Sequence, residues 1–202
     1  MNIKNILIFF YRKIFFIYVF IFGRKSMQFI NNIFLSLTLN AKGYKNFGNF
    51  KQTGEKKFLQ SISQDLKISL DIGANIGKYT ELLLLESNSK IISFEPLKEA
   101  FNELKKIENI NQDRLKVFNY ALGEENTSLE LNFSDEKSEK ATFIKDIDKL
   151  SFFEHEKNKK LMTKILTLDN FFLENSSLIN NKNIDLIKID TEGFELEVIK
   201  GA

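Results

Sequence analysis

The chain has 202 residues, 43% of them hydrophobic, which is enough for one globular domain and an extension. Its formal net charge is only +2, from 29 basic and 27 acidic residues, so no broad positive field predicts a nucleic-acid partner. The absence of cysteine excludes disulfides, thiolate metal ligands and a cysteine nucleophile. We therefore expect a cytoplasmic protein.

Residues 1–50 are predicted to form a hydrophobic, helical extension. Residues 6–22 are almost wholly apolar and aromatic, but Arg12 and Lys13 interrupt them near the middle. A spanning helix needs about 20 apolar residues, and each cation near its centre costs roughly 2.5–3.5 kcal/mol. Two interpretations stay open: peripheral contact of residues 6–22 with a membrane surface, or a helix packed on the following domain. A second helix is expected around Phe29–Leu39.

From Gly54 onward, helical and extended patterns alternate. The expected elements are a helix over residues 54–66, a strand at Lys67–Ile72, a helix over residues 76–85, a strand at Lys90–Glu95, a helix that Pro96 opens, and a strand at Leu115–Tyr120. Strands and helices that alternate in this way predict right-handed βαβ units and a parallel sheet buried on both faces.

The middle of the domain changes pattern. Residues 128–133 alternate strictly between polar and apolar, which predicts an antiparallel strand with residues 141–144 as its partner. Residues 145–160 are rich in charge and predict a solvated loop or helix. A helix at Leu168–Glu174, a strand at Ile184–Asp190 and a helix over residues 193–200 complete the pattern. The predicted fold class is α/β: a Rossmann-like, doubly wound, mostly parallel sheet with a small antiparallel insertion, in a domain over residues 51–202.

The turn after the first strand is the first candidate site. Gly73 and Gly77 allow a ligand to approach the backbone, and the next helix points its amino-terminal dipole at the same place. Asp71 stands where the dinucleotide pattern has its first glycine, and a carboxylate there repels a pyrophosphate but attracts an ammonium or a sulfonium. Glu95 ends the next strand, where an acid accepts ribose hydroxyls. The alternative is that Asp71 only caps the turn and Glu95 is a solvated strand end.

The second candidate site surrounds the last strand. Lys188 and Asp190 lie two residues apart on one strand face, so in a buried strand they need partners or a ligand. One interpretation is an ion pair of Lys188 with Asp190 or Glu192. The other places Asp190 beside the methionine part of a cofactor and Glu192 near the acceptor. The single histidine, His155, is interpreted as a surface residue, and no metal site is predicted.

The chain resembles the FkbM-type methyltransferases. The resemblance rests on six motifs: Leu70–Thr80, Ser93–Pro96, Ala121–Gly123, Thr167–Asp169, Asp185–Glu195 and Val198–Gly201. It implies S-adenosyl-L-methionine as cofactor and the hydroxyl of a small molecule or glycan as methyl acceptor. It also implies cofactor contacts for Asp71, Gly73, Asn75, Gly77, Glu95, Asp190 and, upstream of the first strand, Glu55.

Three functions follow as hypotheses. In an O-methyltransferase, Asp190 or Glu192 takes the hydroxyl proton, provided that apolar surroundings raise its pKa. A nicotinamide-dependent oxidoreductase is the second, which Asp71 argues against. The third is a catalytically incomplete fragment, or a membrane-surface interaction protein, that retains the cofactor-binding half of the fold. It is motivated by Ile6–Phe22 and by the end at Ala202, because family members normally continue through further strands.

Overall fold

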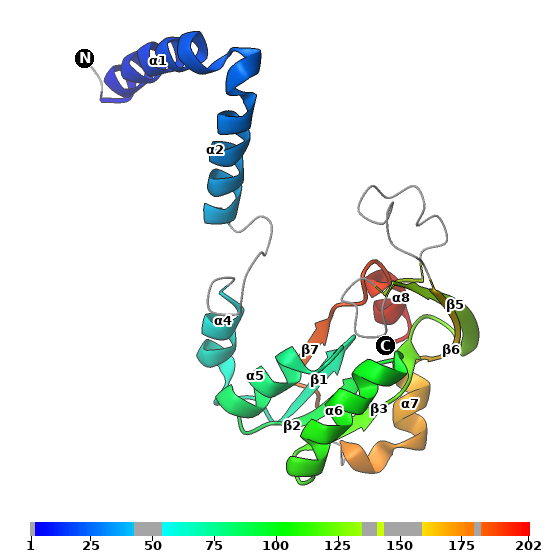
Figure 1. Ribbon diagram of the computed structural model, residues 1–202. Helices are drawn as coiled ribbons and strands as arrows, with labels where there is room; N and C mark the ends of the chain where they lie inside the picture. The colour runs from blue at the N-terminus through cyan, green and yellow to red at the C-terminus, as the bar shows by residue number, and fades with distance from the viewer. Residues whose placement is uncertain (1–2, 43–53, 135–140, 144–158, 180–182) are drawn as a thin grey trace. The chain divides into compact units, whose positions relative to one another are not determined.

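The structure is a computed structural model that describes residues 3–42, 54–134, 141–143, 159–179 and 183–202 (Figure 1). Its contacts divide the chain into two compact units, residues 1–55 and residues 56–202. The second unit contains both sheets. It also contains all the residues predicted to contact the cofactor except Glu55, which belongs to the first unit.

The amino-terminal unit is helical. It contains α1 (Ile3–Phe22), the short 3₁₀ helix η1 (Lys25–Met27) and α2 (Gln28–Ala41). The helix expected around residues 29–39 is therefore confirmed. Among the residues that the structure describes, no helix combines the length and the apolar character that crossing a membrane requires.

The second unit alternates strands and helices as the sequence predicts. Its helices are α4 (Glu55–Ile62, of which Glu55 is the last residue of the first unit), α5 (Lys78–Glu86), α6 (Lys98–Ile110), α7 (Leu168–Glu174), η3 (Ser176–Leu178) and α8 (Glu195–Lys200). Its strands are β1 (Ile68–Ile72), β2 (Lys90–Phe94), β3 (Leu115–Phe118), β4 (Ala121–Leu122), β5 (Thr127–Phe133), β6 (Lys159–Leu166) and β7 (Leu186–Ile189). Strands β3, β2, β1 and β7 form one parallel sheet in that order, so the predicted α/β class is confirmed.

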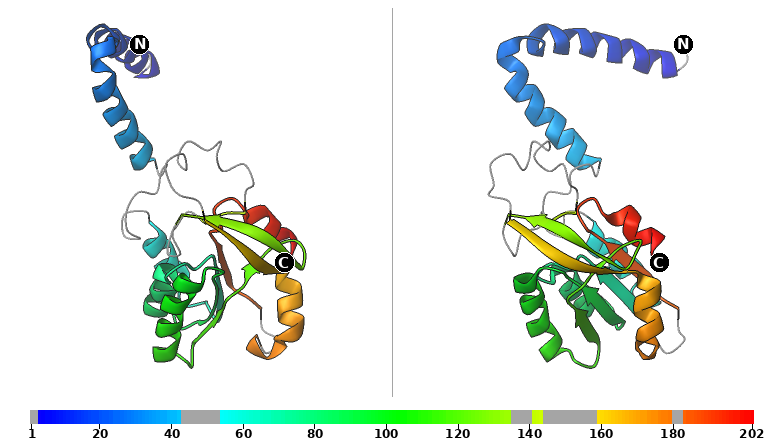
Figure 2. Two further views of the ribbon diagram at one scale, coloured as in Figure 1. Left: turned by 45° about the vertical axis from the view of Figure 1, so that its right-hand side comes forward. Right: turned by 90° about the vertical axis from the view of Figure 1, so that its right-hand side faces the viewer.

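Helices cover both faces of the parallel sheet (Figure 2). Leu70 and Phe94 point to the face that packs against α7 and α8, where the rings of Phe94 and Phe171 meet edge to face at 4.8 Å. The alternating positions point to α5, from which Thr80 contacts Asp71. One face of the sheet is thus an apolar core, whereas the other carries the polar residues of the first motif.

The second sheet corrects two expectations. Its order is β4-β6-β5, with β5 antiparallel and β4 parallel to β6. Along its whole length β5 pairs with β6. The described part of the expected partner, residues 141–143, adds an antiparallel bridge between Asn132 and Thr142, so the expected pairing is present only there. The second correction concerns residues 145–160: residues 144–158 lie outside the described ranges, but Lys159 and Lys160 are strand residues. Charged residues are compatible with strand β6 because their side chains project into solvent, where Lys160 forms an ion pair of 2.7 Å with Glu130 of β5.

Helix α6 also begins later than predicted. Pro96 does not open it, because Leu97 is the amino-terminal cap, with extended backbone, and the helix starts at Lys98. The reason is a local contact: the backbone N–H of Leu97 donates to the side chain of Glu95, two residues earlier, over 2.8 Å. This bond accompanies the extended backbone of Leu97 just after β2.

Candidate functional site

The turn between β1 and α5 is a nest of left-handed residues. Gly73, Asn75 and Gly77 have φ angles of 74°, 50° and 90°. The N–H groups of Gly73 and Ala74 both donate to the carbonyl of Phe94, at 3.1 and 3.0 Å, which ties the turn to the end of β2. A Cβ at Gly73 would lie 2.0 Å from the carbonyl oxygen of Asp190. The two candidate sites of the sequence therefore meet at Gly73.

Asp71 lies beneath this turn and is completely buried. Thr80 Oγ1 donates to its Oδ2 over 2.7 Å, and the same hydroxyl lies 2.9 Å from Ser93 Oγ. Its other oxygen, Oδ1, is 3.1 Å from Lys188 Nζ, which is ion-pairing distance although the angles are not those of a hydrogen bond. The structure thus places Asp71 in a buried polar cluster, where Lys188 compensates its charge.

Lys188 connects the two motifs. Its ammonium donates to the carbonyl of Gly73 over 3.1 Å and lies 3.6 Å from Asp190 Oδ2. The ion pair of Lys188 with Asp190 that the sequence allowed is present, but the pair with Asp71 was missed. No local pattern signals it, because the partners meet only when β7 pairs with β1. The Asp190 side chain remains 62% exposed, so it is open to solvent at the end of β7.

Glu95 faces the glycine turn. Its Oε2 accepts from the N–H of Asn75 and its Oε1 from the N–H of Leu97, both over 2.8 Å. The residue is only 5% exposed. Burial raises the pKa of Glu95 to about 7, against the opposing effect of the two hydrogen bonds, and the nearby charge of Asp71 adds to the rise. The two acids predicted as a cofactor pair, Asp71 and Glu95, therefore interact electrostatically.

The loop after β7 is held by a residue that the sequence did not single out. Glu192 and Gly193 both have positive φ angles, of 52° and 99°, and Glu192 is exposed. Glu195 Oε1 accepts from the N–H groups of Thr191 and Gly193, at 2.9 and 3.0 Å. Burial acts to raise the pKa of Glu195, but these hydrogen bonds outweigh it and lower the pKa below its usual value. The sequence signals were its place at the end of the Asp185–Glu195 motif and in the first turn of the expected helix, but no role was predicted for it.

The remaining predictions lie away from this cluster or outside the described residues. Glu55 is the first residue of α4, is half-buried and belongs to the amino-terminal unit, so its cofactor role stays a prediction. His155 lies outside the described ranges. Within those ranges, no group of three or more His, Cys, Asp or Glu could hold a metal ion.

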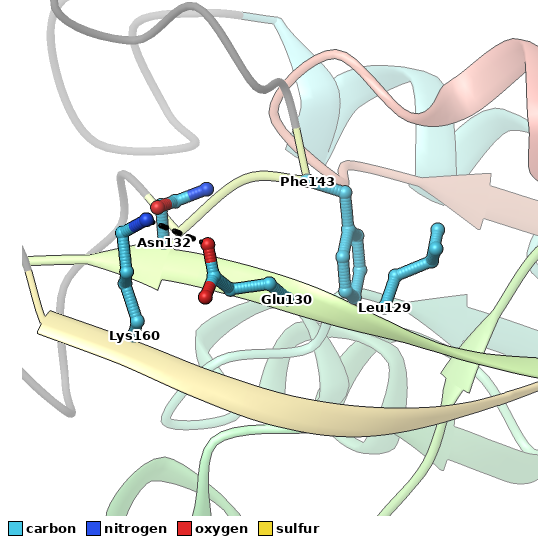
Figure 3. A pocket seen from close by; sticks show the side chains of 5 residues that line it. All are labelled: Leu129, Glu130, Asn132, Phe143 and Lys160. Atoms are coloured by element: carbon cyan, nitrogen blue, oxygen red, sulfur yellow. Dashed lines mark hydrogen bonds and ion pairs between the residues drawn. The ribbon is translucent and has the colours of Figure 1, made fainter.

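A hollow of about 270 Å³ lies on the second sheet (Figure 3). It is lined by Leu129, Glu130, Asn132, Phe143 and Lys160, and an ion pair of 2.7 Å between Lys160 and Glu130 crosses it. None of the predicted site residues lines it. The rings of Phe143 and Phe194 have their centres 4.8 Å apart, so the hollow borders the loop that follows β7.

Three acids, Asp71, Glu95 and Asp190, gather at the carboxyl ends of β1, β2 and β7, where the ammonium of Lys188 lies within 4 Å of Asp71 and Asp190. Burial is the main cause of the raised pKa of Glu95, and the charge of Asp71 adds to it. A cationic ligand suits these carboxyl groups, whereas a pyrophosphate would be repelled by them. The donor set therefore fits a cofactor with an ammonium and a sulfonium.

Comparisons with known proteins agree with this chemistry. A family model described as the methyltransferase FkbM domain matches residues 71–202. Methyltransferase 1 of Beauveria bassiana (strain ARSEF 2860) is 28% identical over 148 residues, 65% of this chain and 57% of that protein. The chain thus spans little more than half the length of this curated relative.

Solved structures resemble smaller parts of the chain. Pyrococcus horikoshii TYW2 in complex with MeSAdo has a TM-score of 0.30 at 20% identity, over 34% of this chain and 27% of that one. A protein described as an rRNA methylase from Clostridium thermocellum has a TM-score of 0.31 at 17% identity, over 38% and 45%. Both likenesses are too partial to carry weight. The match that extends from Asp71 to the last residue shows the family: the chain belongs to the FkbM methyltransferase domain family.

Proposed function

We propose that this protein transfers a methyl group from S-adenosyl-L-methionine to a hydroxyl of a small molecule or glycan. One observation carries the proposal: the left-handed turn at Gly73, the buried carboxyl of Glu95 and the exposed carboxylate of Asp190 converge at the carboxyl edge of a parallel sheet. Ligands of open α/β sheets bind at this edge. Membership of the FkbM family supports the reaction class.

In this proposal, different residues at the carboxyl edge of the parallel sheet bind different parts of the cofactor. The backbone of residues 73–77 lets the amino acid part of the cofactor approach closely, since glycine leaves the turn without side-chain bulk at two positions. Glu95 accepts the ribose hydroxyls with the lone pairs that Asn75 and Leu97 leave open. Asp190 lies beside the methyl group. When bound, the cofactor supplies an electrophilic methyl group on a sulfonium.

Asp71 supports the turn from beneath. Its carboxylate holds the ammonium of Lys188, which in turn donates to the carbonyl of Gly73. The turn is therefore ordered by contacts within the protein, so cofactor binding does not have to offset the entropy cost of ordering it. A direct contact of Asp71 with the cofactor stays a prediction.

The chain's own task in the reaction is to align the acceptor and to remove its proton. Asp190 and Glu192 are the proposed bases, because both carboxylates lie in the loop after β7, where an incoming hydroxyl can reach them. Both are exposed to solvent, so the apolar surroundings that a base requires would have to come from the bound cofactor and acceptor. Glu95 has a pKa of about 7, which would suit proton transfer. Its burial and its two backbone donors, however, assign it to binding.

Calorimetric titration of the full chain tests the cofactor. We expect S-adenosylhomocysteine to bind and NAD to give no heat. Binding should also weaken as the pH falls below about 7, because the ribose hydroxyls need the ionised form of Glu95. Glu95→Gln should bind more weakly and without this pH dependence. Binding of NAD together with no binding of S-adenosylhomocysteine would overturn the proposal.

Methyl transfer to a panel of glycans and small alcohols, followed by mass spectrometry, tests the reaction. Asp190→Asn and Glu192→Gln should lower turnover at saturating cofactor, at least tenfold for the residue that acts as base. Glu124→Gln is the matched control, since it removes a similar exposed carboxylate from another surface. Cofactor binding without transfer to any hydroxyl would favour the incomplete-fragment hypothesis.

A further inference from the structure

The helices of the amino-terminal unit expose nearly all of their large apolar side chains. In α1 these are the side chains of residues 8–11 and 14–21, and in α2 they include Phe29, Ile33 and Phe34. Apolar surface in water is unfavourable by roughly 25 cal/mol per Å². An exposed apolar surface of this extent indicates an interaction site.

The same segment has an unbalanced charge. Residues 1–54 contain eight Lys or Arg and no Asp or Glu, a formal charge of +8. Residues 55–202 contain the other 21 basic residues and all 27 acidic ones, a formal charge of −6. The near-neutral total therefore conceals a strongly cationic segment, which complements an anionic surface.

The cations and the apolar residues of α1 are arranged by helical spacing. Phe10, Ile14, Ile17 and Ile21 recur at i, i+4, i+7 and i+11, which puts them on one stripe with Lys13 at its flank. We call these four apolar residues the α1 stripe. Arg12 projects from the opposite side, which it shares with the apolar side chains of Phe16 and Val19. A helix that lies parallel to a membrane buries such a stripe while its long cationic side chains reach the headgroups.

The cations lie close to aromatic rings. Lys13 Nζ is 4.8 Å from the centre of the Phe9 ring, and the guanidinium of Arg24 is 5.9 Å from that of Phe20. Aromatic rings with adjacent cations are typical of the interface between headgroups and acyl chains. A membrane-spanning α1 would instead place Arg12 and Lys13 near the centre of the bilayer, at roughly 2.5–3.5 kcal/mol each.

Polar contacts at the junction connect α1 with α2. Tyr18 OH donates to Asn31 Oδ1 over 2.7 Å, and Asn31 Nδ2 donates to the carbonyl of Phe22 over 2.8 Å. The rings of Phe22 and Phe34 meet edge to face at 6.4 Å. The two helices are therefore joined at this point, and α2, which has no charged residue, adds apolar surface to the unit.

We propose that residues 3–41 dock the protein on an anionic lipid surface, with the α1 stripe among the upper acyl chains and Arg12, Lys13, Arg24 and Lys25 against lipid phosphates. The proposal is independent of methyl transfer. A second copy of the chain fits the segment less well, because residues 3–41 contain five Lys or Arg and no Asp or Glu, so two such segments repel each other. A nucleic acid would match the charge but would leave the α1 stripe exposed.

Flotation of the full chain with lipid vesicles tests this proposal without any cofactor. We expect binding to vesicles of mixed phosphatidylcholine and phosphatidylglycerol, and at least about tenfold weaker binding to phosphatidylcholine alone, since each cation near an anionic surface contributes about 1 kcal/mol. Binding should weaken at 1 M salt, where the Debye length is about 3 Å.

Two matched pairs of variants test the geometry. Ile17→Glu on the α1 stripe should abolish binding, whereas Phe16→Glu, on the side of Arg12, should weaken it less. The double variant Arg12→Gln with Lys13→Gln should lose the preference for anionic vesicles. Lys98→Gln with Lys116→Gln removes the same charge from exposed positions of the other unit and should bind as the unaltered chain does. Thermal unfolding confirms that each variant is folded.

Several results would overturn the proposal. They are the absence of flotation, equal binding to neutral vesicles, and equal effects of Ile17→Glu and Phe16→Glu. Retention on the membrane after alkaline carbonate extraction would identify a spanning helix instead. Dimerisation without vesicle binding would identify a second copy as the partner, and salt-sensitive binding to nucleic acid without vesicle binding would identify a nucleic acid.

Discussion

Asp71 and Lys188 stand directly opposite each other on the neighbouring strands β1 and β7, with Oδ1 and Nζ 3.1 Å apart. Asp71 is fully buried, and a buried carboxylate stays ionised only with a partner. Lys188 also donates to the carbonyl of Gly73. Strand β7 therefore supplies the charge that holds the turn after β1, so the proposed cofactor site depends on the pairing of β1 with β7.

Lys188→Met should destabilise the protein by about 3–5 kcal/mol, because it leaves Asp71 buried without a counter-charge. The variant should also bind S-adenosylhomocysteine more weakly, since the turn loses its support. Urea unfolding measures the first effect and calorimetry the second. Lys200→Met is the control, because its ion pair with Glu124 lies on the surface, and it should leave the unfolding midpoint unchanged. Equal effects of the two variants would contradict the assigned role of Lys188.

The raised pKa of Glu95 predicts a pH dependence of stability. Because the pKa of about 7 in the folded state exceeds the ordinary value of 4.5, the folded state binds the proton more tightly. The contribution of Glu95 to the free energy of unfolding is therefore fully present below pH 4.5 and is lost as the pH rises through 7. The loss amounts to roughly 3 kcal/mol.

Glu95→Gln removes this titration and isolates it from that of other groups. Unfolding in urea at several pH values should show a difference between the two proteins that changes between pH 4.5 and 7 and is constant above. A constant difference across this range would show that Glu95 does not carry the raised pKa.

Gly73→Ala tests the contact of the turn with β7. The added Cβ would lie 2.0 Å from the carbonyl oxygen of Asp190. Because φ at this position is +74°, the backbone strain of a left-handed alanine adds to the cost of this steric overlap. We expect a loss of at least about 3 kcal/mol in the free energy of unfolding. Gly54→Ala is the matched control: its φ is +88°, but no atom lies within 4 Å of the added Cβ, so about 1–2 kcal/mol of backbone strain is expected. Equal losses would exclude the overlap with Asp190.

Glu195→Ala should loosen the loop that carries Asp190 and Glu192. It leaves the N–H groups of Thr191 and Gly193 without their acceptor, which should lower the free energy of unfolding by about 1 kcal/mol because the loop is partly exposed. We expect a lower kcat, because the proposed bases lose their fixed position. Glu195→Gln, which keeps one acceptor oxygen, should restore part of it, and Glu197→Ala removes a carboxylate from the same helical turn as the control. The lowered pKa predicts that this stabilisation is lost as the pH falls below 4.5.

The sequence by itself predicted the parallel sheet and the place of the site. Apolar runs such as residues 68–72, followed by a glycine and a helical pattern, identify a strand, a turn and a helix, because the periodicity reflects which faces are buried. Parallel strands place their carboxyl ends at one edge, so short-range patterns were enough to predict Asp71, Glu95 and Asp190 at the same edge of the sheet. That these residues bind a cofactor stays a prediction.

Only the tertiary structure decided which groups pair with which. It replaced residues 141–144 by β6 as the partner of β5, joined Lys188 to Asp71, and gave Glu195 its place beneath the loop. Strand pairing and ion pairing depend on the distance between residues remote in sequence, which periodicity does not encode. Composition likewise marked residues 6–22 as apolar, but the alignment of the α1 stripe opposite Arg12 follows from the helix that the chain forms. The sequence by itself determined which charged residues stand at the carboxyl edge of the sheet. Only the fold decided which of these charges are compensated by an ion pair.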